Sequence, residues 1–372
     1  MTDPFSRRIH ACEQRLEDGE AVVLSPGPTL TYLTGFETAP SERHFLFFLT
    51  PGRDPVVFAP AMYDAQLEDT PVEPRLWDDG DDPREVLEDV CTALGDLEHI
   101  YVDDRMWAQF TQDLRDVRPD ATYGLASEVL EDLRIRKDET ELETLARAGE
   151  LADRVSMEIR GRGEEVIGLT EAELAAEIER LLTEYGGEEP AFETIVASGP
   201  NGARPHHHSG DRTIEAGDPV VLDFGAYVAA DLESGTARYP GDQTRTVVFD
   251  GEPTAEFREV HTVVREAQAA AVEAVEPGVP AGEIDRVARS VIEEAGYGDA
   301  FVHRTGHGVG LEVHEPPYIV EGNDRELEAG MVFSVEPGIY LEGRFGVRIE
   351  DLVVVTEDGA ERLNESSRVW DE

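Results

Sequence analysis

Short apolar runs separated by turn residues dominate the first third of the chain and predict a small α/β domain there. Such runs, bounded by proline, glycine and aspartate, are typical of buried strands, and a segment with helical spacing lies among them. Strands are predicted at residues 21–24, 44–49, 56–58 and 99–102, and a helix at residues 86–94. We place this domain at residues 1–130, where no residues with obvious chemistry cluster.

Helical spacing becomes prominent after residue 130, where we predict a second domain spanning residues 131–372. Asp138 and Thr140 are residue types that cap helices, and each has a glutamate three residues later, as in a capping box. Further helices are predicted from Thr170 onward and at residues 257–275 and 281–294. The mixture of helices and strands assigns the chain to the α/β (α+β) class.

The second domain contains an internal repeat that places carboxylates at matching positions. Residues 214–227 align without gaps on residues 327–340, and five of fourteen positions are identical. Each copy has one carboxylate at the end of a predicted strand and another on the strand that follows. These are Asp223 and Asp242 in the first copy and Glu336 and Glu350 in the second. Two copies related by a pseudo-twofold axis would bring the four carboxylates together at their seam.

The surroundings of these carboxylates favour a metal centre over a set of exposed charges. Asp223 stands between Leu222 and Phe224, and the burial of several like charges is costly unless cations compensate them. The glycine-rich segment 301–316 supplies three histidines, and the glycines beside His307 allow a close backbone approach to a site. Those glycines also argue against a pair of metal-binding histidines on one helical face.

A set of four carboxylates and one imidazole is rich in hard oxygen ligands. It favours divalent ions such as Mn²⁺, with Co²⁺, Fe²⁺ and Zn²⁺ as alternatives. Five protein ligands are too many for one open catalytic ion, whereas two ions bridged by carboxylates, about 3.5–4 Å apart, accommodate them. Such a pair lowers the pKa of a bridging water and polarises a carbonyl group, which is hydrolase chemistry without a covalent intermediate.

The charge of the chain excludes some partners and predicts a dependence on salt. Asp and Glu number 81 against 32 Lys and Arg, which gives a formal net charge of −49. This charge excludes a sequence-independent nucleic-acid binder and argues against an anionic membrane surface as a partner. Lys137 is the only lysine, and the acids are spread along the chain. We therefore expect a halophilic protein built for molar salt, where charge repulsion is screened within about 3 Å.

The remaining features predict a reduced, cytoplasmic protein. Cys12 and Cys91 are too few for a disulfide framework and match no metal motif, so we expect free thiols that are buried. The first residues carry charges without an apolar signal-peptide core. No apolar run approaches the roughly 18 residues of a membrane span.

Six segments resemble the pita-bread metallopeptidases, the family of Xaa-Pro dipeptidase (prolidase), Xaa-Pro aminopeptidase and methionine aminopeptidase. They are residues 195–206, 221–225, 241–246, 303–315, 336–340 and 347–351. The resemblance implies a creatinase-like N-terminal α/β domain at residues 1–130, a pita-bread domain with a pseudo-twofold repeat at residues 131–372, and a homodimer. It also implies that two metal ions are bound by Asp223, Asp242, His307, Glu336 and Glu350, with Asp242 and Glu350 bridging.

In the proline-specific branch of that family, the residues matching His206, His303, His314 and Arg348 line the substrate site. By resemblance, His303 and His314 would hold the scissile carbonyl or the charge that develops on it. Glu336 would also handle the proton between the nucleophile and the leaving nitrogen. His206 and Arg348 would bind substrate or orient the metal ligands, and Thr244 would support those ligands.

The chain departs from the family pattern at two places. The interval between Asp223 and Asp242 holds an insert, residues 229–237, which we expect to lengthen a hairpin near the site. His206 is followed by His207 and His208, which we expect to face solvent rather than to bind a metal.

The predicted function is hydrolysis of Xaa-Pro bonds in small peptides with proline in the second position. An Xaa-Pro dipeptidase is favoured over an Xaa-Pro aminopeptidase. The alternatives are an amidohydrolase similar to creatinase or ectoine hydrolase, and a non-enzymatic scaffold on the same fold. Creatinases and scaffold members have lost metal ligands, whereas all five positions are intact in this chain.

Overall fold

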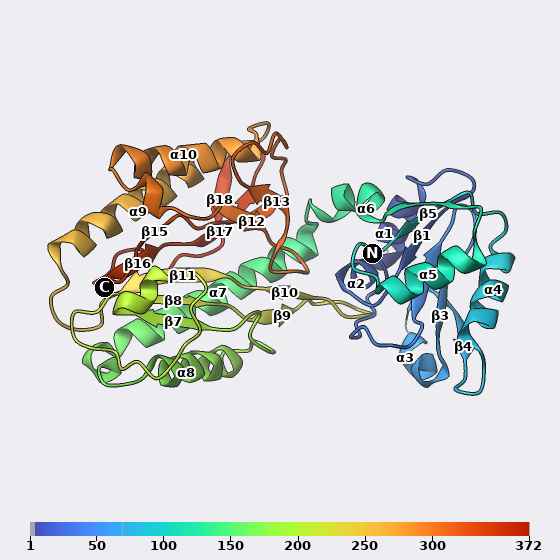
Figure 1. Ribbon diagram of the computed structural model, residues 1–372, viewed down its shortest axis with the longest axis horizontal. Coiled ribbons are helices and arrows are strands. Elements are labelled where there is room, and N and C mark those ends of the chain that lie inside the picture. Colours follow the sequence, from blue (N-terminus) through green and yellow to red (C-terminus); the bar gives the residue numbers. More distant parts are fainter. Residues whose placement is uncertain (1–3, 69, 372) are drawn as a thin grey trace. The chain divides into compact units, whose positions relative to one another are not determined.

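The computed structural model describes residues 4–68 and 70–371, and the chain divides into two compact units (Figure 1). Unit 1 comprises Met1–Arg134 and Asp231–Ala237, and unit 2 comprises Ile135–Ala230 and Arg238–Glu372. Unit 1 extends past residue 130 because its last helix is tied to it: Arg15 donates to the carbonyl of Val129, and Tyr32 donates to that of Leu133.

Unit 1 is built on a six-stranded sheet in the order β4-β3-β2-β1-β5-β6. Its strands are β1 (Glu20–Leu24), β2 (Leu46–Leu49), β3 (Val56–Pro60), β4 (Glu73–Trp77), β5 (His99–Val102) and β6 (Thr122–Leu125). The strand pairs β1–β2 and β2–β3 are antiparallel, and the others are parallel. The apolar runs predicted β1, β2, β3 and β5. They missed β4 and β6 because these edge strands are largely exposed and carry no apolar run.

The helices of unit 1 enclose its core. They are α1 (Pro4–Glu13), α2 (Pro28–Thr34), α3 (Asp64–Leu67), α4 (Pro83–Ala93), α5 (Ala108–Val117) and α6 (Ser127–Arg134), with the short 3-10 helix η1 (Ala61–Tyr63). The carboxylate of Asp82 caps α4, whose buried face packs with the apolar side chains of the sheet. Cys12 and Cys91 are buried free thiols, as predicted.

Unit 2 holds a three-stranded antiparallel sheet, a five-stranded sheet and two hairpins. The first sheet has the order β11-β8-β7, with β7 (Ile195–Ser198), β8 (Val220–Phe224) and β11 (Gln243–Val247). The second has the order β13-β12-β14-β17-β18, with β12 (Gly306–Gly308), β13 (Glu315–Ile319), β14 (Val332–Val335), β17 (Asp351–Val355) and β18 (Ala360–Arg362). The hairpins are β9 (Tyr227–Ala229) with β10 (Arg238–Pro240), and β15 (Gly338–Leu341) with β16 (Phe345–Arg348).

Helices cover the strands of unit 2 on two sides (Figure 1). On one side lie α7 (Glu139–Gly161) and α8 (Glu171–Glu184), and on the other lie α9 (Ala255–Glu273) and α10 (Ala281–Glu294). The short 3-10 helices are η2 (Gly163–Val166), η3 (Gly199–Ala203) and η4 (Gly298–Ala300). Capping boxes begin α7 at Asp138 and α8 at Thr170. The sequence pattern predicted Asp138 as a cap and Thr170 as the start of a helix.

The two halves of the internal repeat meet through β11 and the segment before β17. Asp223 in β8 lies opposite Thr244 in β11, and the amide of Glu350 donates to the carbonyl of Thr244 (3.1 Å). Arg245 forms an ion pair with Asp351 (2.8 Å), and both side chains are almost completely buried. This seam places the carboxylates of both halves beside one another.

The insert between Asp223 and Asp242 connects β9 to β10 in a hairpin, and its residues Asp231–Ala237 belong to unit 1. The amide of Thr236 donates to the carbonyl of Gly35 (2.7 Å). Gly35 and Gly235 both have positive φ angles, and a Cβ atom on either residue would collide with the ring of Phe5. Glycine at both positions therefore allows the close approach of the two backbone segments.

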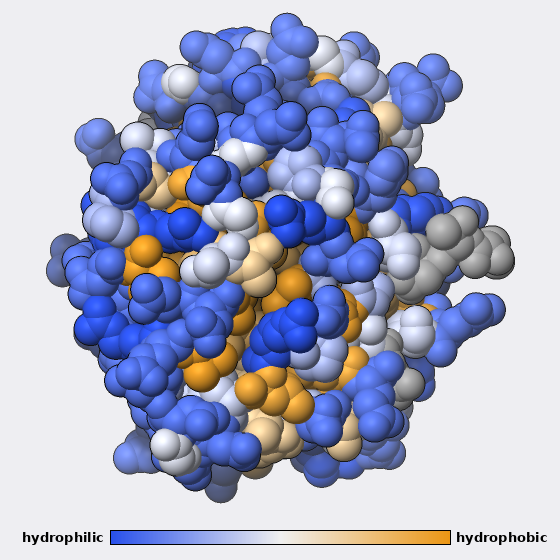
Figure 2. Space-filling model, turned by 90° about the vertical axis from the view of Figure 1, so that its right-hand side faces the viewer, coloured by the Kyte–Doolittle hydropathy of each residue, from blue (hydrophilic) through white to orange (hydrophobic). Residues whose placement is uncertain are grey.

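The surface is strongly hydrophilic on the face that Figure 2 shows, where apolar residues gather only in small groups between polar ones. Among the helices of the described residues, none has the length and apolar character that a membrane crossing requires.

Candidate metal centre

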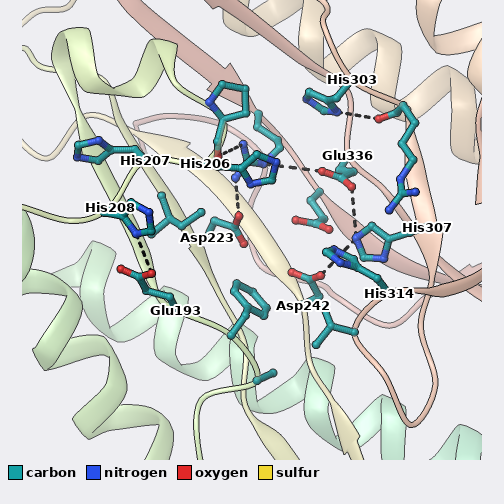
Figure 3. A pocket seen from close by; sticks show the side chains of 18 residues that line it. Glu193, His206, His207, His208, Asp223, Asp242, His303, His307, His314 and Glu336 are labelled. Carbon is teal, nitrogen blue, oxygen red and sulfur yellow. Dashed lines mark hydrogen bonds and ion pairs between the residues drawn. The ribbon is translucent and has the colours of Figure 1, made fainter. Parts of the chain in front are cut away.

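The four carboxylates of the repeat and His307 line one pocket of unit 2 (Figure 3). Side-chain ligand atoms of Asp242, His307 and Glu350 all lie within 4.8 Å of one another, and the three residues are buried. Nε2 of His307 lies 3.8 Å from Oδ2 of Asp242 and 3.4 Å from Oε1 of Glu336. The sequence therefore predicted a set of residues that the tertiary structure brings together.

The protonation state of His307 fits a metal ligand. Its Nδ1 lies 3.3 Å from the carbonyl oxygen of Gly308, and only an N–H group can donate to a carbonyl. Burial and the neighbouring His314 lower the pKa of His307 to about 3, so the ring is neutral and Nε2 carries a lone pair. This lone pair faces the oxygens of Asp242 and Glu336, an arrangement that a cation between them would stabilise.

The four carboxylates of the repeat outnumber the two arginines that line the pocket with them. Burial and the neighbouring Asp223 raise the pKa of Asp242 well above its ordinary value, and burial and Asp242 do the same for Glu350. Burial raises the pKa of Glu336 to about 7, although Arg348 opposes the shift. Oδ1 of Asp223 is buried without a hydrogen-bond partner among the described residues. These residues fit divalent metal ions, which would neutralise the oxygens that the protein leaves unsatisfied.

Arg348 is almost completely buried and binds one of the carboxylates of the pocket. The side chain is 4% exposed, and its Nη2 donates to Oδ2 of Asp223 at 2.5 Å. Its Nε donates to Oγ1 of Thr244 (3.0 Å), and Thr244 in turn donates to Oε2 of Glu350 (2.6 Å). Of the two roles predicted for Arg348, the geometry favours orientation of the carboxylates, and Thr244 has the supporting position expected for it.

His303 is held by the protein through both ring nitrogens. Nδ1 donates to the carbonyl of Arg304 (2.7 Å, Figure 3), and Nε2 lies 2.8 Å from the hydroxyl of Tyr340. The expected contact of His303 with a scissile carbonyl is therefore not available in this arrangement. His206 and His314 are exposed in the pocket, and within residues 4–68 and 70–371 their side chains make no hydrogen bond, which leaves both free for a substrate.

The expectation that His207 faces solvent was wrong. Its side chain is 10% exposed, and Nε2 lies 2.7 Å from Oε2 of Glu171, a fully buried carboxylate at the start of α8. Glu171 also accepts hydrogen bonds from Ser198 and Asn201. The buried carboxylate is thus hydrogen-bonded by residues that precede and follow His206 in the chain. Burial alone would raise the pKa of Glu171, but these hydrogen bonds outweigh it and lower the pKa.

His208 lies at the surface, as predicted. Its side chain is 82% exposed, and Nδ1 lies 2.8 Å from Oε2 of Glu193, which is itself largely exposed (Figure 3). The two adjacent histidines therefore have opposite environments, and only His207 is part of the buried network.

The only lysine of the chain supports the strand that follows His314. Nζ of Lys137 is completely buried and lies 2.7 Å from Oε1 of Glu315, the first residue of β13. A single lysine in a chain that otherwise uses arginine was a visible anomaly, but its partner lies 178 positions away, and no local pattern indicated it.

Tyr340 and Glu171 were likewise missed, since a tyrosine in a strand and a glutamate in a first helical turn are ordinary at those places.

Comparisons with known proteins agree with this geometry. Residues 8–136 match the creatinase/prolidase N-terminal domain, and residues 143–357 match metallopeptidase family M24. The probable dipeptidase PepE of Mycobacterium tuberculosis is 42% identical over 370 residues, which cover 97% of this chain and 94% of the relative. The Xaa-Pro dipeptidase of Lactobacillus delbrueckii subsp. lactis is 38% identical over 366 residues, 95% of each chain.

A solved structure is similar over the whole length. The prolidase from Thermococcus sibiricus has a TM-score of 0.91 and 38% identity, and the match covers 100% of this chain and 99% of that one. The predicted combination of a creatinase-like N-terminal domain with a pita-bread domain is thereby confirmed. With both domain models matched and relatives similar along nearly their whole length, the chain belongs to metallopeptidase family M24 and is a metal-dependent peptidase.

Proposed function

We propose that this protein is an Xaa-Pro dipeptidase that works with two divalent metal ions, preferably Mn²⁺. The proposal rests on one observation: four carboxylates, three of them buried, lie beside the neutral imidazole of His307 at the seam of the repeat. Relatives named dipeptidase, Xaa-Pro dipeptidase and prolidase support the assignment. A proline imide nitrogen has no N–H group, so a dedicated site is a reasonable requirement for this bond.

The metal ligands in this proposal are Asp223, Asp242, His307, Glu336 and Glu350. As the family resemblance implies, Asp242 and Glu350 would bridge the two ions, and both side chains are buried. When bound, such ions activate a water molecule and polarise the scissile carbonyl. The oxygen-rich donor set is what favours Mn²⁺ over softer metals.

The remaining steps belong to side chains of this chain. A carboxylate oxygen of Glu336 would accept the proton of the attacking water and return it to the proline nitrogen. His314 would hold the carbonyl oxygen, and His206 would contact the substrate from the opposite wall of the pocket (Figure 3). Arg348 would keep Asp223 in place throughout.

A paired hydrolysis assay tests the proposal. The protein is incubated with Mn²⁺ in molar KCl with an Xaa-Pro dipeptide or an Xaa-Pro-Xaa tripeptide, and the products are identified by mass. We expect cleavage of the dipeptide alone. Cleavage of the tripeptide would instead identify an Xaa-Pro aminopeptidase with an open site. If neither peptide is cut while metal is bound, proline specificity is refuted and a non-peptide amide becomes the substrate to seek.

The assembly predicted from the family resemblance is also a proposal. We infer that the chain forms a homodimer. Light scattering coupled to size-exclusion chromatography in molar KCl should give twice the chain mass of 41.0 kDa, and a mass near that of one chain would contradict it.

A further inference from the structure

The buried carboxylate of Glu171 binds one loop of unit 2 at several points. The side chain of Glu171 has no exposed surface. Its Oε1 accepts hydrogen bonds from the amide and the hydroxyl of Ser198 (both 2.7 Å) and from Nδ2 of Asn201 (3.0 Å). Its Oε2 lies 2.7 Å from Nε2 of His207 and accepts a hydrogen bond from the amide of Gly210 (3.3 Å). Both oxygens of this carboxylate are therefore used by a single loop.

The residues that bind Glu171 stand on both sides of His206 in the chain, two before it and two after it. The ring of His206 is exposed in the pocket and makes no hydrogen bond in the part of the chain that the structure describes. The backbone of the loop therefore determines where this ring lies. Figure 3 shows the rings of His206 and His207 pointing in different directions. Of these two neighbours, His207 is held by Glu171, and His206 is presented to the pocket.

The helix that carries Glu171 gives the loop a rigid support. Glu171 is the first residue of α8, whose apolar side chains Leu174, Ile178 and Leu181 are buried in the core of unit 2. The amide of Glu171 donates to the carbonyl of Arg212 (3.0 Å), so the main chain also ties the start of the helix to the segment that follows the loop. A negative charge in the first turn of a helix is favoured by the helix dipole. The carboxylate is thus fixed from the side of the core.

The same loop contacts the metal centre through β16. Gly202 in the loop and Gly346 in β16 lie so close together that a Cβ atom on Gly346 would collide with the carbonyl oxygen of Gly202. Nη1 of Arg348 donates to the carbonyl of Pro205 at 3.5 Å, which is longer than the usual range, so this contact is weak. The shorter hydrogen bonds that fix the loop are those to Glu171.

We propose that Glu171 is a positioning residue for the peptidase reaction and acts through His206; this inference rests on the proposed function. Hydrogen bonds to an ionised carboxylate are shorter and stronger than those between neutral groups, so Glu171 holds the loop in one arrangement. An amide at this position would offer one acceptor oxygen, and its NH2 group would face donors with which it cannot pair. The loop would then relax and move His206, and a displacement of about 1 Å costs up to about 100-fold in rate.

A double-mutant cycle between Glu171 and His206 tests this role. Steady-state kinetics with alanyl-proline are measured for the Mn²⁺-loaded wild type, Glu171→Gln, His206→Ala and the double variant. We expect each single change to lower kcat/KM about 10- to 100-fold. The double variant should match His206→Ala, because a residue that acts through His206 has nothing to position once that ring is absent. Losses that multiply in the double variant would show that the two residues act independently and would overturn the inference.

A milder change keeps the test decisive if Glu171→Gln does not fold. Asn201→Ala removes one donor group from Glu171 and leaves the carboxylate with its other partners. We expect kcat/KM to fall about 2- to 10-fold, and we expect this loss to disappear when His206→Ala is also present. A loss that persists beside His206→Ala would contradict the role of Glu171.

Asp113 provides a matched control, because it is also a buried carboxylate beside a histidine. Its Oδ2 lies 2.8 Å from Nε2 of His44 in unit 1, and it does not line the pocket. Asp113→Asn should lower the melting temperature and leave kcat/KM at its wild-type value at temperatures where the variant is folded. An equal loss of kcat/KM in Asp113→Asn and Glu171→Gln would show that destabilisation alone causes it, and the inference would fail.

Two measurements that need no substrate separate this inference from the proposed function. Hydrogen exchange followed by mass spectrometry reports the opening of the loop, and elemental analysis reports bound manganese. In Glu171→Gln, the amides of residues 198–210 should exchange at least about tenfold faster than in wild type, with an unchanged manganese content. Unchanged exchange, or a loss of manganese, would overturn the role of Glu171. A wild type that cleaves no Xaa-Pro dipeptide would refute the proposed function, whatever the exchange shows.

Discussion

The hydroxyl oxygen of Tyr340 lies 2.8 Å from Nε2 of His303 and gives that ring nitrogen a hydrogen-bond partner. Nδ1 of His303 carries the hydrogen and donates it in a hydrogen bond to the backbone carbonyl of Arg304. Nε2 therefore has the lone pair and accepts a hydrogen bond from the Tyr340 hydroxyl. Burial raises the pKa of Tyr340 to about 12 and lowers the pKa of His303 to about 4. The hydroxyl also accepts from Arg348 (2.9 Å), so one buried chain of hydrogen bonds links His303 to the arginine that holds Asp223.

Tyr340→Phe should break this chain. The change removes one hydroxyl and leaves Nε2 of His303 and Nη1 of Arg348 each without that partner. We expect the free energy of unfolding to fall by about 1–3 kcal/mol. We expect kcat/KM to fall about 10- to 100-fold, as for other groups that orient metal ligands. Urea denaturation and steady-state kinetics measure the two effects, and an unchanged unfolding free energy would show that the chain of hydrogen bonds contributes nothing.

Asp242→Asn should abolish peptidase activity. A neutral amide cannot bridge two cations as a carboxylate does, so we expect at least about a 100-fold loss of kcat and a lower metal content after dialysis. Elemental analysis and single-substrate kinetics on the same sample give both values. Turnover near that of wild type would show that the ligand assignment is wrong.

The metal-free protein should lose stability as the pH rises through the pKa of Glu336. Burial raises that pKa to about 7 in the folded protein, above about 4.3 in an unfolded chain. A group with a raised folded pKa stabilises the fold at pH values below its unfolded pKa, and this contribution disappears as the pH rises through the folded value.

The matched comparison for this effect is Glu336→Gln, which has no proton to lose. Relative to wild type, the metal-free variant should gain thermal stability steadily from about pH 4.5 to pH 7.5. The difference in melting temperature between the two proteins, measured across this range with a chelator present, cancels the contributions of the carboxylates that do not interact with Glu336. A constant difference would contradict the raised pKa.

His207→Ala should destabilise the protein, whereas the adjacent His208→Ala should not. His207 donates to the buried carboxylate of Glu171, and its loss removes one of the donors that satisfy this anion. We expect the free energy of unfolding to fall by about 1–3 kcal/mol for His207→Ala. For the exposed His208→Ala we expect a change within about 0.5 kcal/mol. Denaturant titration of both variants measures these changes. Equal free energies of unfolding for the two variants would show that His207 has the surface role first expected for it.

Stability should rise with KCl concentration. The formal net charge of −49 destabilises a compact chain by self-repulsion, and molar salt screens this repulsion within about 3 Å. We therefore expect the melting temperature to increase from dilute buffer to molar KCl. A flat profile would show that the acidic surface is no adaptation to salt.

Much of the fold follows from local patterns. Apolar runs located the buried strands β1, β2, β3 and β5, a capping residue located the start of α7, and helical spacing located α8. These features depend on neighbours a few positions apart, which a sequence displays directly. The edge strands β4 and β6 were missed because they are largely exposed and carry no apolar run.

The candidate metal ligands were also visible in the sequence, because the repeat places Asp223 and Glu336 in one column and because a buried carboxylate is unusual. Only the tertiary structure decided which partners each group has. His207 and Glu171 are 36 positions apart, and Lys137 and Glu315 are 178 apart. A hydrogen bond depends on where two side chains meet in space, and the local periodicity of a chain carries information on burial and secondary structure but not on the identity of so distant a partner.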